Sequence, residues 1–216
     1  MTETRGHIKK ILKRTLPLEL QSYLTRRPSI GIDRASWDRE YAAGEWSKLG
    51  NLDEMPRYAL IAGYTRNIGS GASVLDVGCG EGHLASWLLE DGKRRYFGID
   101  LSSVAIQKAR GRASNGARFE VADAGTFYTE ERFDIIVLNE VLYYIEQPEQ
   151  ALERYTDLLA PGGVLIISMY RVPESISVWR RVVSQVDVID KVWLRGSSRT
   201  EWDVWLCRPA QCSNCG

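Results

Sequence analysis

Histidine, net charge and long apolar runs are all scarce in this sequence. Its 216 residues include only His7 and His83, and 28 basic side chains offset 28 acidic ones. No apolar run reaches the roughly 18 residues that a membrane-spanning helix requires, and the first residues lack the apolar core of a secretory signal peptide. We therefore expect a cytoplasmic protein without a transmembrane segment, whose chemistry does not depend on a histidine base.

Cysteine is also sparse, and its distribution does not predict a disulfide framework. Cys79 falls inside a glycine-rich stretch, whereas Cys207, Cys212 and Cys215 lie within the last ten residues. The C-x-x-C pair there is compatible with metal or redox chemistry, but a tetrahedral zinc site needs four ligands and no histidine lies nearby. We interpret residues 211–216 as a flexible tail with incidental thiols.

Glycine, by contrast, is concentrated where an apolar strand pattern ends. The stretch Val74–Gly82 reads V-L-D-V-G-C-G-E-G, and a helical pattern over residues 83–90 follows it directly. It contains one acidic residue and three glycines at alternate positions: Asp76, Gly78, Gly80 and Gly82. Glycine permits tight turns and close approach of a ligand to the backbone, and a helix N-terminus offers unpaired N–H groups. The pattern predicts a turn that holds a nucleotide-like ligand.

Three further strand patterns, over residues 95–99, 118–122 and 133–138, also run into polar residues. These residues are Asp100, Asp123, and Asn139 followed by Glu140. Near-continuous apolar runs are typical of parallel strands that are buried on both faces. Because the carboxyl ends of such strands meet at one edge of a sheet, we expect these polar side chains to share one site.

The motif D-V-G-C-G-E-G resembles the first motif of class I S-adenosylmethionine-dependent methyltransferases. Its G-x-G-x-G spacing is one residue tighter than the dinucleotide fingerprint G-x-G-x-x-G, which argues against a nicotinamide-dependent dehydrogenase. A second stretch, L-A-P-G-G-V-L over residues 159–165, also resembles the family at the matching place. The resemblance implies a cofactor, S-adenosylmethionine, and an enzyme that transfers its methyl group.

The resemblance assigns the cofactor to residues that match the family's motifs. It implies that Gly78, Gly80 and Gly82 wrap the methionine half and that Asp76 helps to hold the amino group. It implies that Asp100, with Leu101, meets the ribose, and that Asp123 and the Ala124 backbone meet the adenine edge. Asn139 is expected in the same site, and by analogy Arg57 is predicted to reach the cofactor's carboxylate.

The fold that the resemblance implies is an α/β domain with a Rossmann-like, mostly parallel sheet of seven strands. The implied strand order is 3-2-1-4-5-7-6, with the last strand antiparallel and helices on both faces. The C-terminal third agrees, since a helical pattern over residues 174–185 precedes a hairpin pattern over residues 186–194 and 202–206. With 44% hydrophobic residues the chain can bury one sizeable core, and we expect the domain to span residues 37–210.

The N-terminal arm, residues 1–36, has a different character. Residues 1–30 carry seven lysines and arginines against two glutamates. Apolar residues at helical spacing predict a basic amphipathic helix: Ile8, Ile11, Leu12 and Leu16. Two interpretations stay open, a helix on an anionic membrane surface and an arm that packs on its own domain or on a second subunit of a homodimer. Because the remainder is acidic, nucleic acid is not an expected partner.

Residues 37–68 are interpreted as a segment that covers the site. Trp37, Tyr41 and Trp46 occur within ten residues, and residues 55–68 form a helical pattern with Pro56 in its first turn. By analogy with related small-molecule methyltransferases, the aromatics would line a lid over cofactor and acceptor. The alternative is that they are buried over the sheet as ordinary core.

The acceptor side is the least determined part of the sequence. Many relatives carry a histidine just after the fourth strand, whereas this chain has Tyr144 at the expected place, so Glu140 and Tyr144 become the catalytic candidates, with Tyr170 as a third. A carboxylate-bound Mg²⁺ is compatible with oxygen ligands, but no acidic cluster indicates one. Small insertions favour a small-molecule or glycan acceptor, and we expect O-methylation of a sugar or related metabolite. N-methylation of an amine or amino sugar and a non-catalytic cofactor-binding protein are the alternatives.

Overall fold

The computed structural model describes residues 33–89, 94–112, 116–196 and 200–210. The predicted amphipathic helix within residues 1–30 and the predicted tail, residues 211–216, therefore lie outside the described residues. Within the described ranges, no helix is long and apolar enough to cross a membrane.

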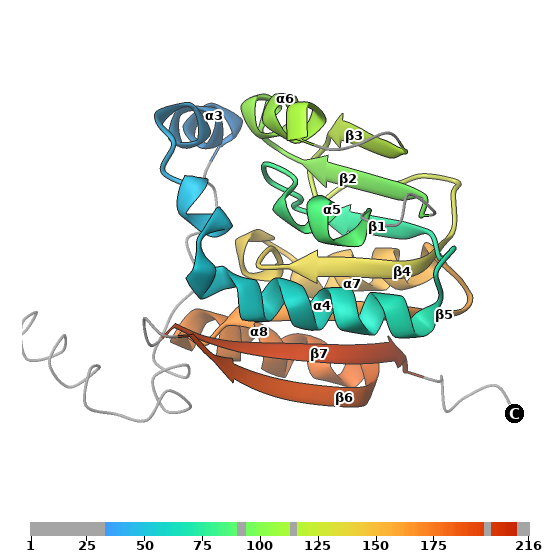
Figure 1. Ribbon diagram of the computed structural model, residues 1–216. Coiled ribbons are helices and arrows are strands. Elements are labelled where there is room, and N and C mark those ends of the chain that lie inside the picture. The colour runs from blue at the N-terminus through green and yellow to red at the C-terminus, as the bar shows by residue number, and fades with distance from the viewer. Residues whose placement is uncertain (1–32, 90–93, 113–115, 197–199, 211–216) are drawn as a thin grey trace, which may run out of the picture.

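A seven-stranded sheet forms the centre of the fold, in the order β3-β2-β1-β4-β5-β7-β6 (Figure 1). Its strands are β1 (Val74–Val77), β2 (Tyr96–Asp100), β3 (Ala117–Val121), β4 (Phe133–Asn139), β5 (Leu159–Tyr170), β6 (Val186–Arg195) and β7 (Glu201–Pro209). Strands β1 to β5 pair in parallel, and β7 pairs antiparallel with both β5 and β6. The predicted strand order and the antiparallel strand are confirmed.

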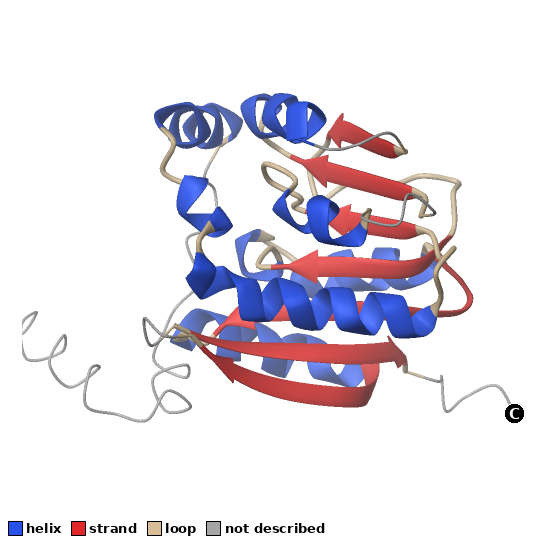
Figure 2. Ribbon diagram, in the orientation of Figure 1, coloured by secondary structure: helices blue, strands red, loops and turns tan. Residues whose placement is uncertain are grey.

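Helices cover both faces of the sheet (Figure 2). On one face lie α4 (Met55–Ile68), α5 (His83–Leu88) and α6 (Ser103–Arg112), and on the other lie α7 (Pro148–Asp157) and α8 (Pro173–Val182). The helix predicted over residues 55–68 has these bounds in the structure, with Pro56 in the first turn, where its missing N–H leaves no gap. The helix predicted over residues 174–185 ends earlier, and its last three residues form the 3-10 turn η4 (Val183–Gln185).

Each face of the sheet buries its own apolar cluster. Leu152, Val178 and Val182 pack on the face of α7 and α8, whereas Ile61, Leu84 and Ile106 pack on the opposite face. Both clusters include residues of β4. In this strand the four consecutive apolar residues 135–138 are fully buried, and the polar Asn139 follows them at the strand end. This is the pattern expected of a central parallel strand.

The stretch L-A-P-G-G, residues 159–163, forms the beginning of strand β5. Leu159 already pairs with Phe133, so β5 begins there, and the pairing shifts register before Ile135. Gly162 has a φ of 79°, which favours glycine, and a side chain on Gly163 would meet carbonyl oxygens of β4 at 3.0–3.1 Å. The two glycines therefore bend an entering strand rather than form a separate loop.

The segment before α4 lies at the carboxyl ends of the parallel strands, on the left in Figure 1. It consists of α3 (Arg34–Ala43), η1 (Ser47–Gly50) and η2 (Leu52–Glu54). Asp33 begins α3 by accepting a hydrogen bond from the Ser36 N–H, and Gly44 ends it with a left-handed φ of 77°. We call residues 33–54 the aromatic segment.

Candidate active site

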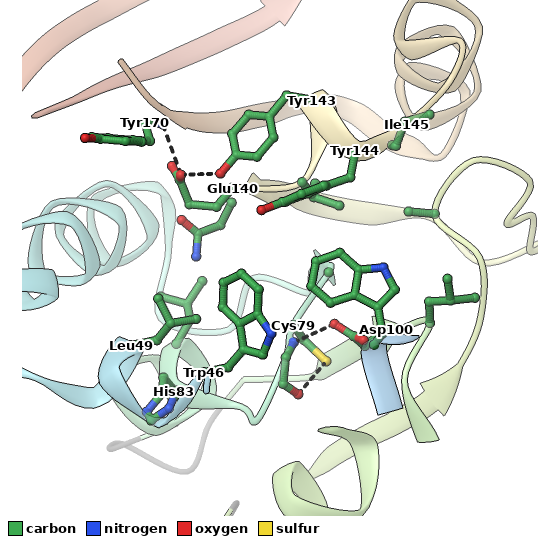
Figure 3. Close-up of a pocket in the computed structure, with 18 of the residues that line it drawn as sticks. Trp46, Leu49, Cys79, His83, Asp100, Glu140, Tyr143, Tyr144, Ile145 and Tyr170 are labelled. Carbon is green, nitrogen blue, oxygen red and sulfur yellow. Dashed lines mark hydrogen bonds between the residues drawn. The ribbon is translucent and has the colours of Figure 1, made fainter. Parts of the chain in front are cut away.

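A cavity of about 940 Å³ opens at the carboxyl ends of the strands, between the sheet edge and the aromatic segment (Figure 3). This volume is at the upper end of the range, roughly 300–1,000 Å³, that small-molecule sites occupy. The predicted site residues that line it are Arg57, Gly78, Gly80, Asp100, Leu101, Asp123, Ala124, Asn139, Glu140 and Tyr144. Among the predicted residues, Asp76 and Gly82 do not line it.

The glycine loop is shaped by three left-handed backbone positions that a side chain would disturb. Gly78, Gly80 and Gly82 have φ values of 72°, 54° and 77°. A Cβ on Gly78 would lie 2.8 Å from Val141, and one on Gly80 would lie 3.1 Å from the Tyr41 hydroxyl. At Gly82 a Cβ would lie 3.1 Å from Ala109, so this glycine permits close packing of α6 rather than access to the cavity.

Asp100, at the end of β2, holds the loop from the side. The Gly80 N–H donates to Asp100 Oδ2 at 2.9 Å, and the Ser102 N–H donates to Oδ1 at 2.8 Å. Burial raises the pKa of this carboxyl to about 6, although these N–H donors lower it. Asp100 lines the cavity, so a ligand there can donate a further hydrogen bond to its carboxylate.

Asp123 and Ala124 lie one strand further along the sheet edge. Asp123 is exposed and accepts a hydrogen bond from the Gly125 N–H at 2.7 Å, and the Ala124 carbonyl accepts one from the Tyr155 hydroxyl at 2.7 Å. The hydrogen bond from Tyr155 anchors the loop that contains Asp123 and Ala124 to α7. The structure therefore brings together, in the lining of one cavity, the residues that were predicted to follow β1, β2 and β3: the glycine loop, Asp100, and Asp123 with Ala124.

A buried cation lies at the opposite end of the cavity. Arg57 of α4 has no exposed surface. Its guanidinium donates to Glu54 at 2.6 Å and to Asn139, and it lies 4.6 Å from the Tyr58 ring centre. Glu140 adds a further electrostatic partner. Because a buried charge is tolerated only when it is paired, this cluster fixes the junction between α4 and the end of β4.

Glu140 has an unusual backbone conformation and a carboxylate that accepts several hydrogen bonds. Its φ of 59° is left-handed, a conformation that costs energy for a non-glycine residue. The carboxylate accepts hydrogen bonds from the Tyr143 hydroxyl at 2.6 Å, the Tyr170 N–H at 3.0 Å and the Ser168 hydroxyl at 3.2 Å. Burial raises its pKa, and Arg57 opposes this shift. Figure 3 shows the Glu140 carboxylate with the Tyr143 hydroxyl and the Tyr170 backbone beside it.

Aromatic rings form the cover of the cavity. Trp37 lies with its ring centre 5.4 Å from Trp46 and 6.3 Å from Tyr41, and it meets Tyr144 edge-on at 5.1 Å. All four rings line the cavity. The aromatic segment is thus in contact with both the glycine loop, through Tyr41, and the acceptor-side turn, through Tyr144.

Comparison with known proteins agrees with this geometry. The family model described as "Methyltransferase domain" matches residues 68–203, which is more than half of the chain. The chain belongs to the methyltransferase-domain family. The family prediction made from the glycine motif is therefore confirmed, and the sheet order is that of class I S-adenosylmethionine-dependent methyltransferases.

Two curated proteins show the extent of the sequence similarity. Nodulation protein S of Rhizobium tropici is 35% identical over 140 residues, which are 62% of this chain and 58% of that protein. The trans-aconitate 2-methyltransferase of Methylobacterium nodulans is 29% identical, over 80% of this chain and 67% of that protein. The chain thus spans about three fifths of the first relative's length.

A solved structure extends the fold comparison. The N-methyltransferase NodS of Bradyrhizobium japonicum WM9, in complex with S-adenosyl-L-homocysteine, superimposes with a TM-score of 0.71. The two sequences are 24% identical, and the superposition covers 82% of this chain and 98% of the NodS chain. At this identity the similarity establishes the fold of the methyltransferase domain.

The structure also identifies residues of this methyltransferase domain that sequence reasoning did not single out. Tyr143, rather than Tyr144, donates to Glu140, and the Ser168 hydroxyl, which has one proton to donate, lies 2.6 Å from Asn139 Oδ1 and 3.2 Å from Glu140 Oε1. Both tyrosines belong to the 3-10 turn η3 (Leu142–Tyr144). No pattern in the sequence distinguishes the two adjacent hydroxyls. Among the described residues, no group of three or more His, Cys, Asp or Glu side chains could hold a metal ion.

Asp76 lies beneath the loop of the methyltransferase domain instead of in the cavity. It is 1% exposed, the Tyr96 hydroxyl donates to its Oδ2, and its Oδ1 has no hydrogen-bond partner among the described residues. Burial raises the pKa of Asp76 to about 7. Since the carboxyl binds its proton more tightly in the folded chain than in the unfolded one, its contribution to stability is present at low pH and is lost as pH rises through about 7.

We predict that Asp76→Asn raises the thermal unfolding midpoint at pH 8 and has a smaller effect at pH 5. Removal of a buried, ionised carboxylate should stabilise the domain by roughly 1–4 kcal/mol at pH 8. The matched control is Asp134→Asn, because Asp134 accepts two hydrogen bonds from Ser73 and its pKa is lowered by them, so this change should destabilise. A midpoint for Asp76→Asn that falls at pH 8 would contradict the argument.

Proposed function

We propose that this chain transfers a methyl group from S-adenosylmethionine to an amine nitrogen of a small-molecule acceptor. The observation that carries the proposal is the division of the cavity into two walls. The glycine loop and Asp100 form one wall, Glu140 with Tyr143 and Tyr144 forms the other, and the tryptophan rings of the aromatic segment cover both. The cofactor supplies an already activated methyl group, so the protein contributes mainly binding and alignment.

The first wall fits the proposed cofactor. The glycine loop leaves a backbone cradle that side chains on Gly78 or Gly80 would fill. We propose that Asp100 and Leu101 bind the ribose, that Asp123 and the Ala124 backbone bind the adenine edge, and that Arg57 and Asn139 bind the carboxylate end. For Asp76 the proposal is narrower: it supports the amino group's site from beneath the loop, because it does not line the cavity.

Charge in the cavity favours a cationic acceptor. The described lining residues include seven carboxylates, namely Asp53, Glu54, Glu81, Asp100, Asp123, Glu140 and Glu146. They include three cationic side chains, Lys48, Arg57 and Arg154. Aromatic faces such as Trp46 and Tyr144 also attract ammonium groups. Of these carboxylates, Glu140 belongs to the acceptor wall. An amine, which is an ammonium ion in water at neutral pH, is therefore better matched to this wall than a neutral hydroxyl.

The available bases favour the same acceptor. An alcohol ionises near the pKa of water, roughly 15.7, which is about 11 units above a free glutamate, whereas an alkyl ammonium lies only about 6 units above it. His83 lines the cavity, but its Nδ1 contacts Arg112 and burial lowers the pKa of its ring. We propose that Glu140 receives the amine proton at a carboxylate oxygen, and that Tyr144 shapes the acceptor wall.

O-methylation of a sugar hydroxyl is the second candidate. It is favoured by Trp37 and Trp46 in the lining of the cavity, since aromatic faces pack well against sugar rings. An amino sugar would satisfy both arguments. A protein that binds the cofactor without transferring its methyl group differs from both in showing no product.

We expect matched acceptor pairs to separate these functions. The purified chain would be incubated with radiolabelled S-adenosylmethionine and either glucosamine or glucose, and either benzylamine or benzyl alcohol. Transfer to the amine of each pair, increasing with pH as more amine becomes neutral, is the expected result. Transfer to the alcohols alone would instead establish the second candidate, and binding without transfer to any acceptor would favour a non-catalytic protein.

Cofactor binding should depend on ionised Asp100. We predict that Asp100→Ala weakens binding of S-adenosylhomocysteine by about 1.5–3 kcal/mol, the value for hydrogen bonds to a charged group. Because the pKa of Asp100 is raised to about 6, wild-type affinity should fall below pH 6 and be constant above pH 7. Titration calorimetry at pH 5.5 and 7.5 checks both statements, with Asp157→Ala, at the exposed end of α7, as control. Unchanged affinity in Asp100→Ala would contradict the ribose assignment.

A pair of tyrosine variants tests the acceptor wall. Tyr143→Phe removes the hydroxyl that donates to Glu140 and should lower the rate of methyl transfer roughly tenfold to hundredfold. Tyr144→Phe keeps the ring that packs on Trp37 and should retain most activity. Rates are compared at saturating cofactor. The reverse ranking would assign the catalytic hydroxyl to Tyr144, as the sequence alone predicted.

A further inference from the structure

Helices α3 and α6 lie side by side at one end of the sheet (Figure 1), and each lacks a charge that its own dipole favours. The last turn of α3 contains no basic residue, and the first turn of α6 contains no acidic residue. A helix is stabilised by a cation near its C-terminus and by an anion near its N-terminus. The C-terminus of α3 and the N-terminus of α6 therefore depend on charged groups from other parts of the chain.

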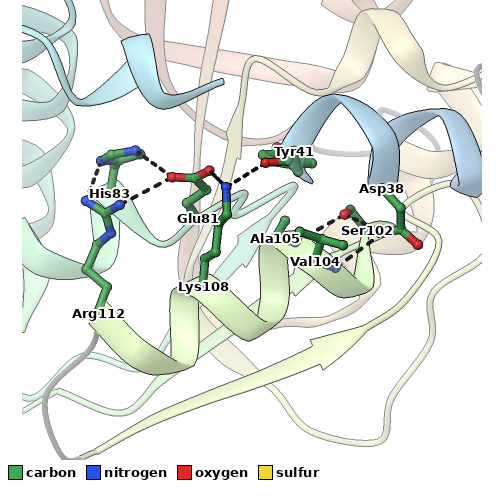
Figure 4. A network of polar contacts seen from close by, with 9 residues as sticks. All are labelled: Asp38, Tyr41, Glu81, His83, Ser102, Val104, Ala105, Lys108 and Arg112. Carbon is green, nitrogen blue, oxygen red and sulfur yellow. Dashed lines mark hydrogen bonds and ion pairs between the residues drawn. The ribbon is translucent and has the colours of Figure 1, made fainter. Parts of the chain in front are cut away.

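Each helix supplies the charge that the other lacks (Figure 4). Asp38 of α3 accepts hydrogen bonds at the start of α6 from the Ser102 hydroxyl at 2.6 Å, the Ser103 hydroxyl at 3.1 Å and the Val104 N–H at 3.3 Å. In return, Lys108 of α6 donates from Nζ to the Tyr41 carbonyl, in the last turn of α3, at 2.6 Å. We call this pair of contacts the reciprocal cap.

Lys108 also contacts the glycine loop. Its Nζ donates to Glu81 Oε1 at 2.8 Å, and Glu81 directly follows Gly80 and is 4% exposed. Arg112 contacts the other oxygen of Glu81 at 3.3 Å, and among the described residues its side-chain hydrogen bonds go to Glu81 and His83, not to α3. Lys108 therefore bridges two segments that line the cavity, the glycine loop and the helix that carries Trp37 and Tyr41.

Apart from these contacts, α3 is weakly attached to the domain. Tyr41 is the one buried residue of this helix. Its hydroxyl lies against the loop, 3.1 Å from where a Cβ on Gly80 would be. A helix that buries so little apolar surface depends on polar contacts for its position, and elements with few buried apolar contacts open most readily. Lys108 and Tyr41 thus contact the loop from the side on which α3 lies.

We propose that Lys108 and Asp38 are positioning residues that couple the glycine loop to the aromatic segment, so that a ligand that orders the loop also orders the acceptor-side cover. The proposal rests on the proposed function in one respect, that S-adenosylhomocysteine binds at the loop. Lys108 transmits the coupling through its two hydrogen bonds, and Asp38 keeps α3 in the place where Lys108 reaches it. By linkage, the order of the segment and the affinity of the loop for its ligand affect each other equally.

Hydrogen–deuterium exchange of the full chain, with and without S-adenosylhomocysteine, tests the coupling. In the wild type, we expect the ligand to slow exchange in both residues 78–82 and residues 33–54. In Lys108→Met, slowing at residues 78–82 should persist, while slowing at residues 33–54 should fall at least fivefold. Arg112→Met is the matched control, since it removes a cation from Glu81 on the same helix, and it should retain both effects.

Each result decides the proposal. Equal ligand-induced slowing of residues 33–54 in the wild type and Lys108→Met would overturn it, as would equal losses in Lys108→Met and Arg112→Met. If Lys108→Met fails to fold by circular dichroism, Asp38→Asn replaces it with the same expected loss. Absence of slowing at residues 78–82 in the wild type would instead show that the ligand does not bind, which overturns the proposed function and the coupling with it.

Discussion

The hydrogen bond from the Gly80 N–H to Asp100 is the contact on which the rest of the cavity depends. It joins the turn after β1 to the end of β2 at 2.9 Å. It forms because Gly80 adopts a φ of 54°, and any side chain at this position would be strained and would meet Tyr41. The loop held in this way carries Glu81, which the α6 cations contact from the far side. The hydrogen bond from the Gly80 N–H thus orients the glycine loop as a wall of the cavity, and it also orients Glu81, through which α6 contacts the loop.

Burial of charge accounts for much of the site's electrostatic character. Burial raises the pKa of Asp76, Asp100 and Glu140 alike. Such groups oppose folding at neutral pH, and perturbed carboxyls of this kind are typical of functional sites. Arg57 offsets part of the cost near Glu140, at the price of being fully buried itself. The domain therefore gives up some stability to keep Asp100 and Glu140 in the lining of the cavity.

The aromatic segment links the two walls. Trp37 contacts Tyr144 on the acceptor side, while Tyr41 lies against the glycine loop. The segment contacts α6 by hydrogen bonds, through Asp38 and the Tyr41 carbonyl, instead of an extensive apolar face. A cover attached in this way can respond to changes in the loop beneath it, because polar contacts exchange with water at little net cost.

Much of the fold was predictable from local sequence features. Alternate glycines after an apolar strand require left-handed backbone, a proline at the first turn begins α4, and unbroken apolar runs mark strands buried on both faces. These features depend on short stretches of chain, so the glycine loop and the polar strand ends at Asp100, Asp123 and Asn139 could be placed without tertiary information. The order of the strands, by contrast, was predicted from the resemblance to a known family.

Other features were decided only by the tertiary structure. Asp76 faces a buried tyrosine because pairing with β2 directs its side chain toward Tyr96, and alternation along β1 does not say which face is open. Tyr143 instead of Tyr144 contacts Glu140, since a single turn directs two adjacent hydroxyls differently. Lys108 meets Glu81 and Tyr41 across 27 and 67 residues of sequence. The sequence alone determined the backbone that local sterics and apolar patterning impose, whereas these partners depended on folding, because side-chain contacts between distant segments form only when the helices pack.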